Sequence, residues 1–328
     1  MPAATPRVAE KIRSGAIAVA PLVSVVISTR NHAAFLPDTI RAVLAQNIAE
    51  PIELIVVDNA STDSTAAVMR QALAGAPRPS TYVRLEHDLG AADGRNVGIS
   101  FARGAFIAFT DSDCTPSAGW LRAAMRAFDD RQVGIVQGRT IPARPRAPLF
   151  EHHIETRRMD GHFSTSNVVY RREALKGLRF DPACWYWEDT DLGWRVRRSG
   201  WTSTFAQDAV VAHAVIPLSP FRWMLWPRHY TNWPAKAARY PEFRRHLFLR
   251  TWVRPMHLLF DLALVGLALA RWRPASLVLA APYVVAFART RGLKGRFPPA
   301  KAGAYIAADL VSFCSLVAGS IRYRSIVL

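Results

Sequence analysis

Short apolar runs alternate with amphipathic, helix-like patterns over the first third of the chain. Runs such as LVSVVIST and IELIVVD are continuous and rich in β-branched residues, as expected of strands covered on both faces. The predicted strands occupy residues 22–29, 52–58, 81–86 and 105–113. Helices are predicted from Leu36, over residues 64–73, and in the segment GRNVGISFA. The alternation predicts an α/β fold with a mostly parallel sheet and helices on both faces, after a weakly structured leader over residues 1–20.

Polar side chains follow the predicted strands at the points where they end. Thr29, Arg30 and Asn31 end the first strand, Asp58 ends the second, and the acidic stretch TDSD ends the fourth. Ligands of such sheets bind at the carboxyl ends of the strands. The sequence therefore predicts one site assembled from separate segments at this edge.

Three longer apolar stretches with basic flanks fill the last third of the chain. They cover residues 256–270, 275–288 and 302–321. The first two are short for a span of about 20 residues, and the first and third each contain an Asp. A buried helical core is one interpretation, but the basic flanks favour a membrane-embedded or interfacial region.

The distribution of charge agrees with a membrane surface. The 328 residues include 42 Lys and Arg against 25 Asp and Glu, a net charge of +17. Residues 217–328 hold 17 of the basic residues and three acidic ones, so this third alone carries +14. A nucleic-acid-binding surface would be polar and basic, whereas this region is apolar with basic residues between its apolar stretches. We therefore predict an α/β domain over 22–216, a helical region bound to membrane lipids over 217–328, and no nucleic-acid partner.

The N-terminal sequence indicates in which cellular compartment the α/β domain is expected. SGAIAVAPLVSVVIS is interrupted by Pro21 and runs into the first predicted strand, so we do not expect it to act as a secretory signal. We expect the α/β domain on the cytoplasmic side of an inner or plasma membrane, and the basic loop 289–301 favours the same side. Three spanning helices, or a hairpin with an interfacial helix, are both compatible with the last third. The three cysteines are scattered and show neither a disulfide framework nor metal-ligand spacing.

Candidate chemistry begins with the stretch TDSD. Asp111 and Asp113, separated by one residue, can share a hard divalent cation together with a substrate phosphate. The alternative is an Asp-rich turn that caps the next helix. Asp58 is open to two interpretations in the same way, as a turn residue or as a partner for the base or ribose of a nucleotide. The glycine-rich LGAADGRNVG fits neither dinucleotide nor P-loop spacing, although its Arg95 can meet a diphosphate.

An acidic cluster lies in CWYWEDTDLGWRVRRSGW. Glu188, Asp189 and Asp191 are framed by aromatic residues, which a solvated turn would not need, and a buried strand would not carry three carboxylates. Asp191 and Arg195 have the i, i+4 spacing of a helical ion pair.

Six segments together resemble the inverting glycosyltransferases of family 2. They are VSVVISTRN, LIVVDNASTDST, LGAADGRNVGI, FIAFTDSD, STSNVVYRREAL and WEDTDLGWRVRRSGW, in the family's order over about residues 22–216. The resemblance implies the GT-A fold, which is Rossmann-like. It also implies a nucleotide-diphosphate sugar donor, Mg²⁺ or Mn²⁺ as cofactor, and single-displacement transfer to a hydroxyl. With membrane attachment, it suggests a glycan or lipid-linked acceptor in cell-envelope or polysaccharide synthesis.

The resemblance also implies roles for individual residues. It places Thr29, Arg30 and Asp58 near the nucleoside, makes Asp111 a ribose or metal-shell residue, and makes Asp113 the direct metal ligand. His213, on a later strand, matches a histidine that completes the metal coordination; a histidine satisfied within the strand is the alternative. The chain departs from the family pattern at Asp88 and at Asp93–Gly94.

The acidic cluster has a counterpart in the family. Asp189 matches the general base, which takes the proton of the acceptor hydroxyl, and Glu188 would orient the acceptor or its neighbours. Trp185, Tyr186 and Trp187 suit a sugar face or a lipid acceptor, with core packing as the alternative for at least one of them.

Other functions are compatible with parts of the sequence. A processive polysaccharide synthase would carry Q-x-x-R-W, which residues 217–250 lack. A nucleotidyltransferase would need a different glycine-rich basic loop near the N-terminus. A non-catalytic membrane scaffold with a vestigial transferase domain is the remaining alternative, and the intact Asp113 and Asp189 argue against it.

Overall fold

The computed structural model describes residues 6–15, 19–145, 150–291 and 299–328. The chain divides into two compact units. The first runs to Pro145 and resumes over His153–Val215, and the second consists of Ile216–Leu328 with the short segment that ends at His152. Each unit is described by itself.

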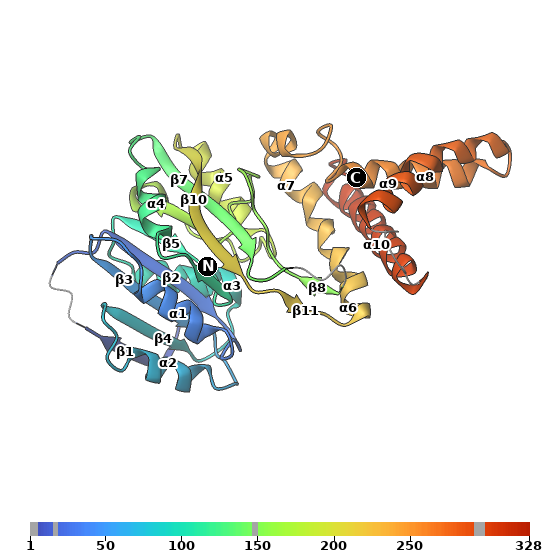
Figure 1. The fold of residues 1–328 in the computed structure, drawn as a ribbon. Coiled ribbons are helices and arrows are strands. Elements are labelled where there is room, and N and C mark those ends of the chain that lie inside the picture. The colour runs from blue at the N-terminus through green and yellow to red at the C-terminus, as the bar shows by residue number, and fades with distance from the viewer. Residues whose placement is uncertain (1–5, 16–18, 146–149, 292–298) are drawn as a thin grey trace. The chain divides into compact units, whose positions relative to one another are not determined.

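The first unit is built on a nine-stranded sheet flanked by helices (Figure 1). Its strand order is β1-β4-β3-β2-β5-β9-β7-β10-β6. The parallel centre consists of β2 (Val23–Thr29), β3 (Ile52–Asp58), β4 (Ser80–Leu85) and β5 (Phe106–Phe109). These are the four predicted strands, and the α/β prediction is confirmed.

Additional strands make the sheet mixed. β9 (Val168–Arg171) lies antiparallel between β5 and β7 (Val133–Pro142), and β10 (Thr202–His213) pairs parallel with β7 and antiparallel with β6 (Cys114–Pro116). The weakly structured leader is a wrong prediction, because β1 (Val8–Ser14) pairs antiparallel with β4 at the sheet edge. Half-exposed edge strands lack the continuous apolar run that identifies central ones.

Successive side chains of β2 point to opposite faces of the sheet, and different helices pack on each face. Val23, Val25 and Ile27 pack in one core with side chains of α1 (Leu36–Leu44), α2 (Thr65–Leu73) and α4 (Trp120–Arg126). Their neighbours point the other way, toward α3 (Gly90–Phe101). A Cβ on Gly98 would lie 2.3 Å from a methyl carbon of Val26. The glycines of the GRNVG segment therefore allow close helix–sheet packing.

The second unit is mainly helical. It begins with a two-stranded pairing of β8 (Glu151–His152) and β11 (Ile216–Pro217). Helical segments follow: α6 (Pro220–Leu225), η2 (Trp226–Asn232), α7 (Trp233–Arg239), η3 (Pro241–His246), α8 (Pro255–Leu269), η4 (Pro274–Ala280), α9 (Ala281–Thr290) and α10 (Pro299–Tyr323). The three apolar stretches form helices, and within the described ranges one of them, Lys301–Tyr323, is long and apolar enough to cross a membrane by length and composition. Much of the basic loop predicted at 289–301 lies outside the described residues.

Candidate active site

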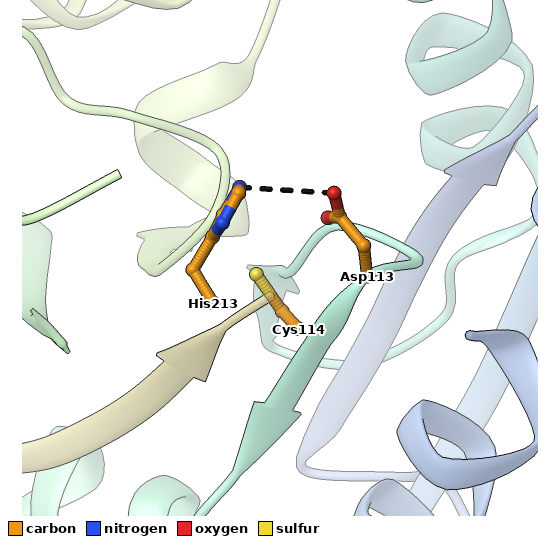
Figure 2. A group of neighbouring side chains, drawn as sticks. All are labelled: Asp113, Cys114 and His213. Atoms are coloured by element: carbon orange, nitrogen blue, oxygen red, sulfur yellow. Dashed lines mark ion pairs between the residues drawn. The ribbon is translucent and has the colours of Figure 1, made fainter. Parts of the chain in front are cut away.

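The acidic pair lies in a turn at the carboxyl end of β5. The strand is shorter than the predicted 105–113 and ends at Phe109, because the chain leaves the sheet before Asp111. The backbone carbonyl of Asp113 accepts a hydrogen bond from Ala214, the residue after β10. This contact brings His213 beside the acidic turn, and its Nε2 lies 3.8 Å from Asp113 Oδ2 (Figure 2). His213 Nδ1 donates to the carbonyl of Ala214 at 2.6 Å, which orients Nε2 toward the carboxylate.

Asp113 and His213 fit a shared divalent ion. Two ligands that each stand about 2.1 Å from one ion are at most about 4.2 Å apart, and both of these side chains are buried. Burial raises the pKa of the Asp113 carboxyl; the His213 side chain opposes this shift and the Asp111 carboxylate adds to it. A cation beside Asp113 would offset the burial of its charge.

Cys114 stands next to this pair, which the sequence did not predict. Its Sγ and the ligand atoms of Asp113 and His213 all lie within 4.8 Å of one another (Figure 2). The reason is the register of β6 and β10, in which Cys114 is opposite His213. Burial raises the pKa of the thiol well above its ordinary value, and Asp111 and Asp113 raise it further. The thiol is therefore protonated and uncharged at neutral pH.

Arg95 connects the acidic pair to the acidic cluster. Its guanidinium is 2.7 Å from Glu188 Oε1 and 3.5 Å from Asp111 Oδ1, with its side chain 13% exposed. Burial alone would lower the pKa of Arg95, but Asp111, Glu188 and Asp189 outweigh it and raise the pKa. The site thus holds a permanent positive charge between α3 and α5 (Glu188–Arg198).

The predicted nucleoside residues lie at the ends of β2 and β3. Thr29 is buried, and its Oγ1 has no hydrogen-bond partner among the described residues. Arg30 forms an ion pair with Asp88. Asp58 is fully buried: Oδ1 accepts from the amide of Ser61 at 2.8 Å and Oδ2 from the hydroxyl of Tyr82 at 2.7 Å. Asp58 therefore holds the turn after β3, and its nucleoside contact stays a prediction.

A cavity of about 410 Å³ connects several of these groups, a size in the range of small-molecule sites. Asp58, Glu188 and Asp189 are not in its lining. Its lining includes the predicted Thr29, Arg30, Arg95, Asp111, Asp113 and His213. It also includes residues that the sequence analysis did not select: Ser28, His32, Asn59, Asp88, Gly90, Ala91 and Ser112. Most of these adjoin the selected strand ends, which is the signal that could have found them. A larger cavity, about 640 Å³, lies at the amino end of β5 and contains none of the predicted site residues.

The acidic cluster forms the first turn of α5. The predicted ion pair between Asp191 and Arg195 is confirmed, with Arg195 Nε 2.7 Å from Asp191 Oδ2 and Asp191 fully buried. Asp189 Oδ1 accepts from the Thr190 amide at 2.6 Å, within the first turn, where the helix dipole favours negative charge. The three carboxylates therefore have different surroundings.

The aromatic residues of the cluster also differ. Trp187 is 8% exposed, so core packing holds for it, and its predicted substrate contact stays untested. Trp185 and Tyr186 are exposed, and their rings stack edge to face with centroids 4.3 Å apart. Tyr186 has a φ of 67°, a left-handed conformation that costs an aromatic residue roughly 1–2 kcal/mol and is found preferentially at functional sites.

Two family descriptions match the chain. Residues 24–181 match glycosyl transferase family 2, and residues 106–289 match glycosyl transferase family group 2. Glycosyltransferase AglE of Haloferax volcanii is 28% identical over 213 residues, which are 61% of this chain and 68% of that protein. Minor teichoic acid biosynthesis protein GgaB of Bacillus subtilis is 27% identical over 184 residues, 52% of this chain but 20% of that protein.

A solved structure has a similar fold. The mannosyltransferase PcManGT from Pyrobaculum calidifontis, in complex with GDP-Man and Mn²⁺, aligns with a TM-score of 0.56 at 20% identity, covering 98% of this chain and 89% of that one. The alignment supports the predicted GT-A fold, and the matched family descriptions support a transferase enzyme over the scaffold alternative. The chain therefore belongs to glycosyl transferase family group 2 and is a glycosyltransferase.

Proposed function

We propose that the chain transfers a sugar from a nucleotide-diphosphate donor to an acceptor hydroxyl with inversion at the anomeric carbon. The observation that carries this proposal is the 410 Å³ cavity, whose lining combines an acidic pair, a histidine and a buried arginine. Anionic phosphates and a cation complement these groups.

The nucleoside end of the donor would lie near Thr29. A buried hydroxyl without a partner among the described residues costs free energy unless a ligand or water satisfies it. Arg30 and Asn59 line the same cavity and offer further donors. The GDP-Man complex of PcManGT supports a nucleotide sugar, although the low identity leaves the base and sugar of this donor open to experiment.

Asp113 and His213 would hold Mg²⁺ or Mn²⁺, with Asp111 nearby. When bound, the ion would neutralise charge on the donor diphosphate. The Mn²⁺ in the PcManGT complex supports this cofactor.

Three residues of the chain would take part in the transfer step: Asp189, Arg95 and Glu188. The acceptor oxygen attacks the anomeric carbon while the bond from that carbon to the diphosphate oxygen breaks. Asp189 takes the proton of the acceptor hydroxyl. Arg95 faces the negative charge that develops on the leaving diphosphate, and Glu188 fixes the guanidinium through its 2.7 Å ion pair.

The acceptor belongs to a cell-envelope or polysaccharide glycan, reached at the cytoplasmic side of a membrane. Support comes from the teichoic acid role in the name of GgaB and from the apolar, basic second unit. A chain truncated after Val215 should become soluble, whereas the full chain should fractionate with membranes. Release of the full chain by high salt alone would mean peripheral attachment and would contradict an embedded second unit.

A donor screen tests the transferase proposal. Nucleotide sugars should raise the apparent melting temperature of the full chain in the presence of Mn²⁺, because a ligand that binds the folded state stabilises it. The Asp113→Ala variant is the matched control. The proposal fails if no nucleotide sugar or nucleoside diphosphate shifts the melting temperature of the unaltered chain.

A further inference from the structure

The second unit contains a helical hairpin of unusual composition. We call Pro255–Leu269 and Pro274–Thr290, that is α8 with η4 and α9, the α8–α9 hairpin (Figure 1). Near its base, Phe260, Ala263 and Tyr283 form a small core. Farther along, Gly266 lets the two arms touch: the Ser276 hydroxyl donates to its carbonyl at 2.8 Å, and a Cβ there would lie 2.7 Å from the Ser276 carbonyl oxygen. The arms are thus held together as one element.

The outer surface of the hairpin is apolar on both arms. Seven large aliphatic side chains are between 44% and 70% exposed: Val265, Leu267, Leu269, Leu277, Val278, Val284 and Val285. Between residues 262 and 288, the only charged side chains are Arg271 and Arg273 at the tip. Helices that are apolar all round occur inside proteins or in lipid, and soluble proteins rarely leave so large a patch in water.

The charged side chains of the hairpin indicate which kind of environment covers its apolar surface. The tip presents Arg271 and Arg273 on either side of Trp272, which is 65% exposed, and the guanidinium of Arg271 lies 4.1 Å from the centre of the Trp272 ring. The one acidic residue of the hairpin, Asp261, accepts a hydrogen bond from Trp252 Nε1 at 2.9 Å. A surface of aliphatic, tryptophan and arginine side chains matches the interface of an anionic bilayer.

Helix α10 is a poorer candidate for membrane insertion, although it alone passes the length and composition criterion in the described part of the chain. The segment 220–239 packs along it: the rings of Trp223 and Tyr305 are 5.4 Å apart, and a Cβ on Gly319 would lie 2.5 Å from the Thr231 carbonyl oxygen. That segment carries Arg222, Arg228, Lys236 and Arg239. A spanning α10 would draw these cations toward hydrocarbon, which is unfavourable for each of them.

The length of the hairpin limits how it can insert. The 15 residues of α8 extend about 22 Å, less than the roughly 30 Å of a bilayer's hydrocarbon core. An upright hairpin would leave its tip arginines within the hydrocarbon. A hairpin that lies close to the membrane plane lets them reach the phosphates of the same leaflet.

We propose that the α8–α9 hairpin inserts into one leaflet of an anionic bilayer and anchors the chain there, while α10 stays outside the hydrocarbon. The proposal rests on the membrane location given under Proposed function. It adds which element enters the lipid, how deeply, and from which side.

Vesicle flotation of the full chain tests which element inserts. On phosphatidylcholine vesicles that contain phosphatidylglycerol, Leu267→Glu and Val278→Glu should each weaken binding about 10-fold or more, because a carboxylate is costly in lipid. The matched control is Leu310→Glu, at an exposed leucine of α10, which should change binding less than about twofold. Loss of binding in the control alone, or in none of the three variants, overturns the proposal.

Two further measurements test charge and depth. Replacing Arg271 and Arg273 by Ala should weaken binding to the anionic vesicles by roughly 20-fold, with little change on pure phosphatidylcholine.

The depth of insertion can be measured by the fluorescence of Trp272, taken as the difference between the unaltered chain and Trp272→Phe. It should be quenched more by lipids brominated near the headgroup than by lipids brominated deep in the acyl chain. Equal loss on both vesicle types, deep quenching or no quenching contradicts shallow insertion.

Nucleoside diphosphate binding with Mn²⁺ in detergent separates this proposal from the transferase proposal. All hairpin variants should bind as the unaltered chain does, since none of these residues lines the 410 Å³ cavity. A chain that transfers sugar but ignores vesicles would overturn the anchor and leave the transferase intact.

Discussion

In the first unit, Arg95, Asp111 and Glu188 form ion pairs with side chains at most 24% exposed, whereas in the second unit the hairpin holds aliphatic side chains up to 70% exposed. Each arrangement is costly for a protein alone in water: charge is buried in one and apolar surface is exposed in the other. We infer from the two arrangements that each unit is completed by something outside the chain. A charged ligand suits the first unit, and lipid suits the second.

If the first unit is completed by a metal and a donor, the largest effect should come from Asp113→Ala. Loss of a metal ligand removes several kcal/mol of interaction, so metal-dependent turnover should fall about 1,000-fold. Calorimetric titration of nucleoside diphosphate with and without Mn²⁺ should show that the metal dependence is lost. Asp208→Ala, at an exposed site on the same strand as His213, is the control. Unchanged metal dependence in Asp113→Ala would remove Asp113 from the metal site.

A smaller effect, about 100-fold on turnover, is expected for Asp189→Asn. The amide keeps the shape of the side chain but cannot take a proton, so donor and metal affinity should stay nearly unchanged. The measurement is the transfer rate at saturating donor, with Asp208→Asn as the control. Near-normal turnover of Asp189→Asn beside an inactive Glu188→Gln or Asp191→Asn would mean that another carboxylate is the base.

Glu188→Gln should be milder, about 10-fold on turnover. It weakens the 2.7 Å ion pair with Arg95, but Arg95 keeps Asp111 as a partner at 3.5 Å. Steady-state kinetics of Glu188→Gln, with the exposed Glu173→Gln as the control, measure the effect. A variant as inactive as Asp189→Asn would indicate that Glu188 itself takes part in the proton transfer.

The smallest effect on turnover is expected for Arg195→Ala, which should nonetheless destabilise the first unit. It leaves the fully buried Asp191 carboxylate without its 2.7 Å partner, and breaking such a pair costs about 3 kcal/mol. Turnover below the melting transition should stay within about threefold. Thermal unfolding compared with the exposed Arg198→Ala checks this, and equal stability of the two variants would show that the pair contributes little.

The central fold could be predicted from the sequence because its signals are local. Strands covered on both faces must be continuously apolar, so β2 and β3 appear almost residue for residue as predicted. The edge strand β1 has no such requirement, since solvent covers part of it, and its pattern was not recognised. The polar residues at the strand ends could also be selected from the sequence, because parallel strands bring their carboxyl ends to one edge of the sheet.

The amino-acid sequence alone is therefore enough to predict the α/β class, the chemical types of the site residues and the apolar, basic character of the last third of the chain. Which of the site residues come into contact follows from the three-dimensional fold. Cys114 joins Asp113 and His213 because β6 and β10 pair in one register, although Cys114 and His213 are 99 residues apart. Arg95 of α3 likewise pairs with Glu188 of α5, which lies 93 residues later in the chain. The fold also distinguished the exposed hairpin from α10, along which the segment 220–239 packs. Hydropathy is summed along the chain, whereas burial depends on contacts between residues far apart in it.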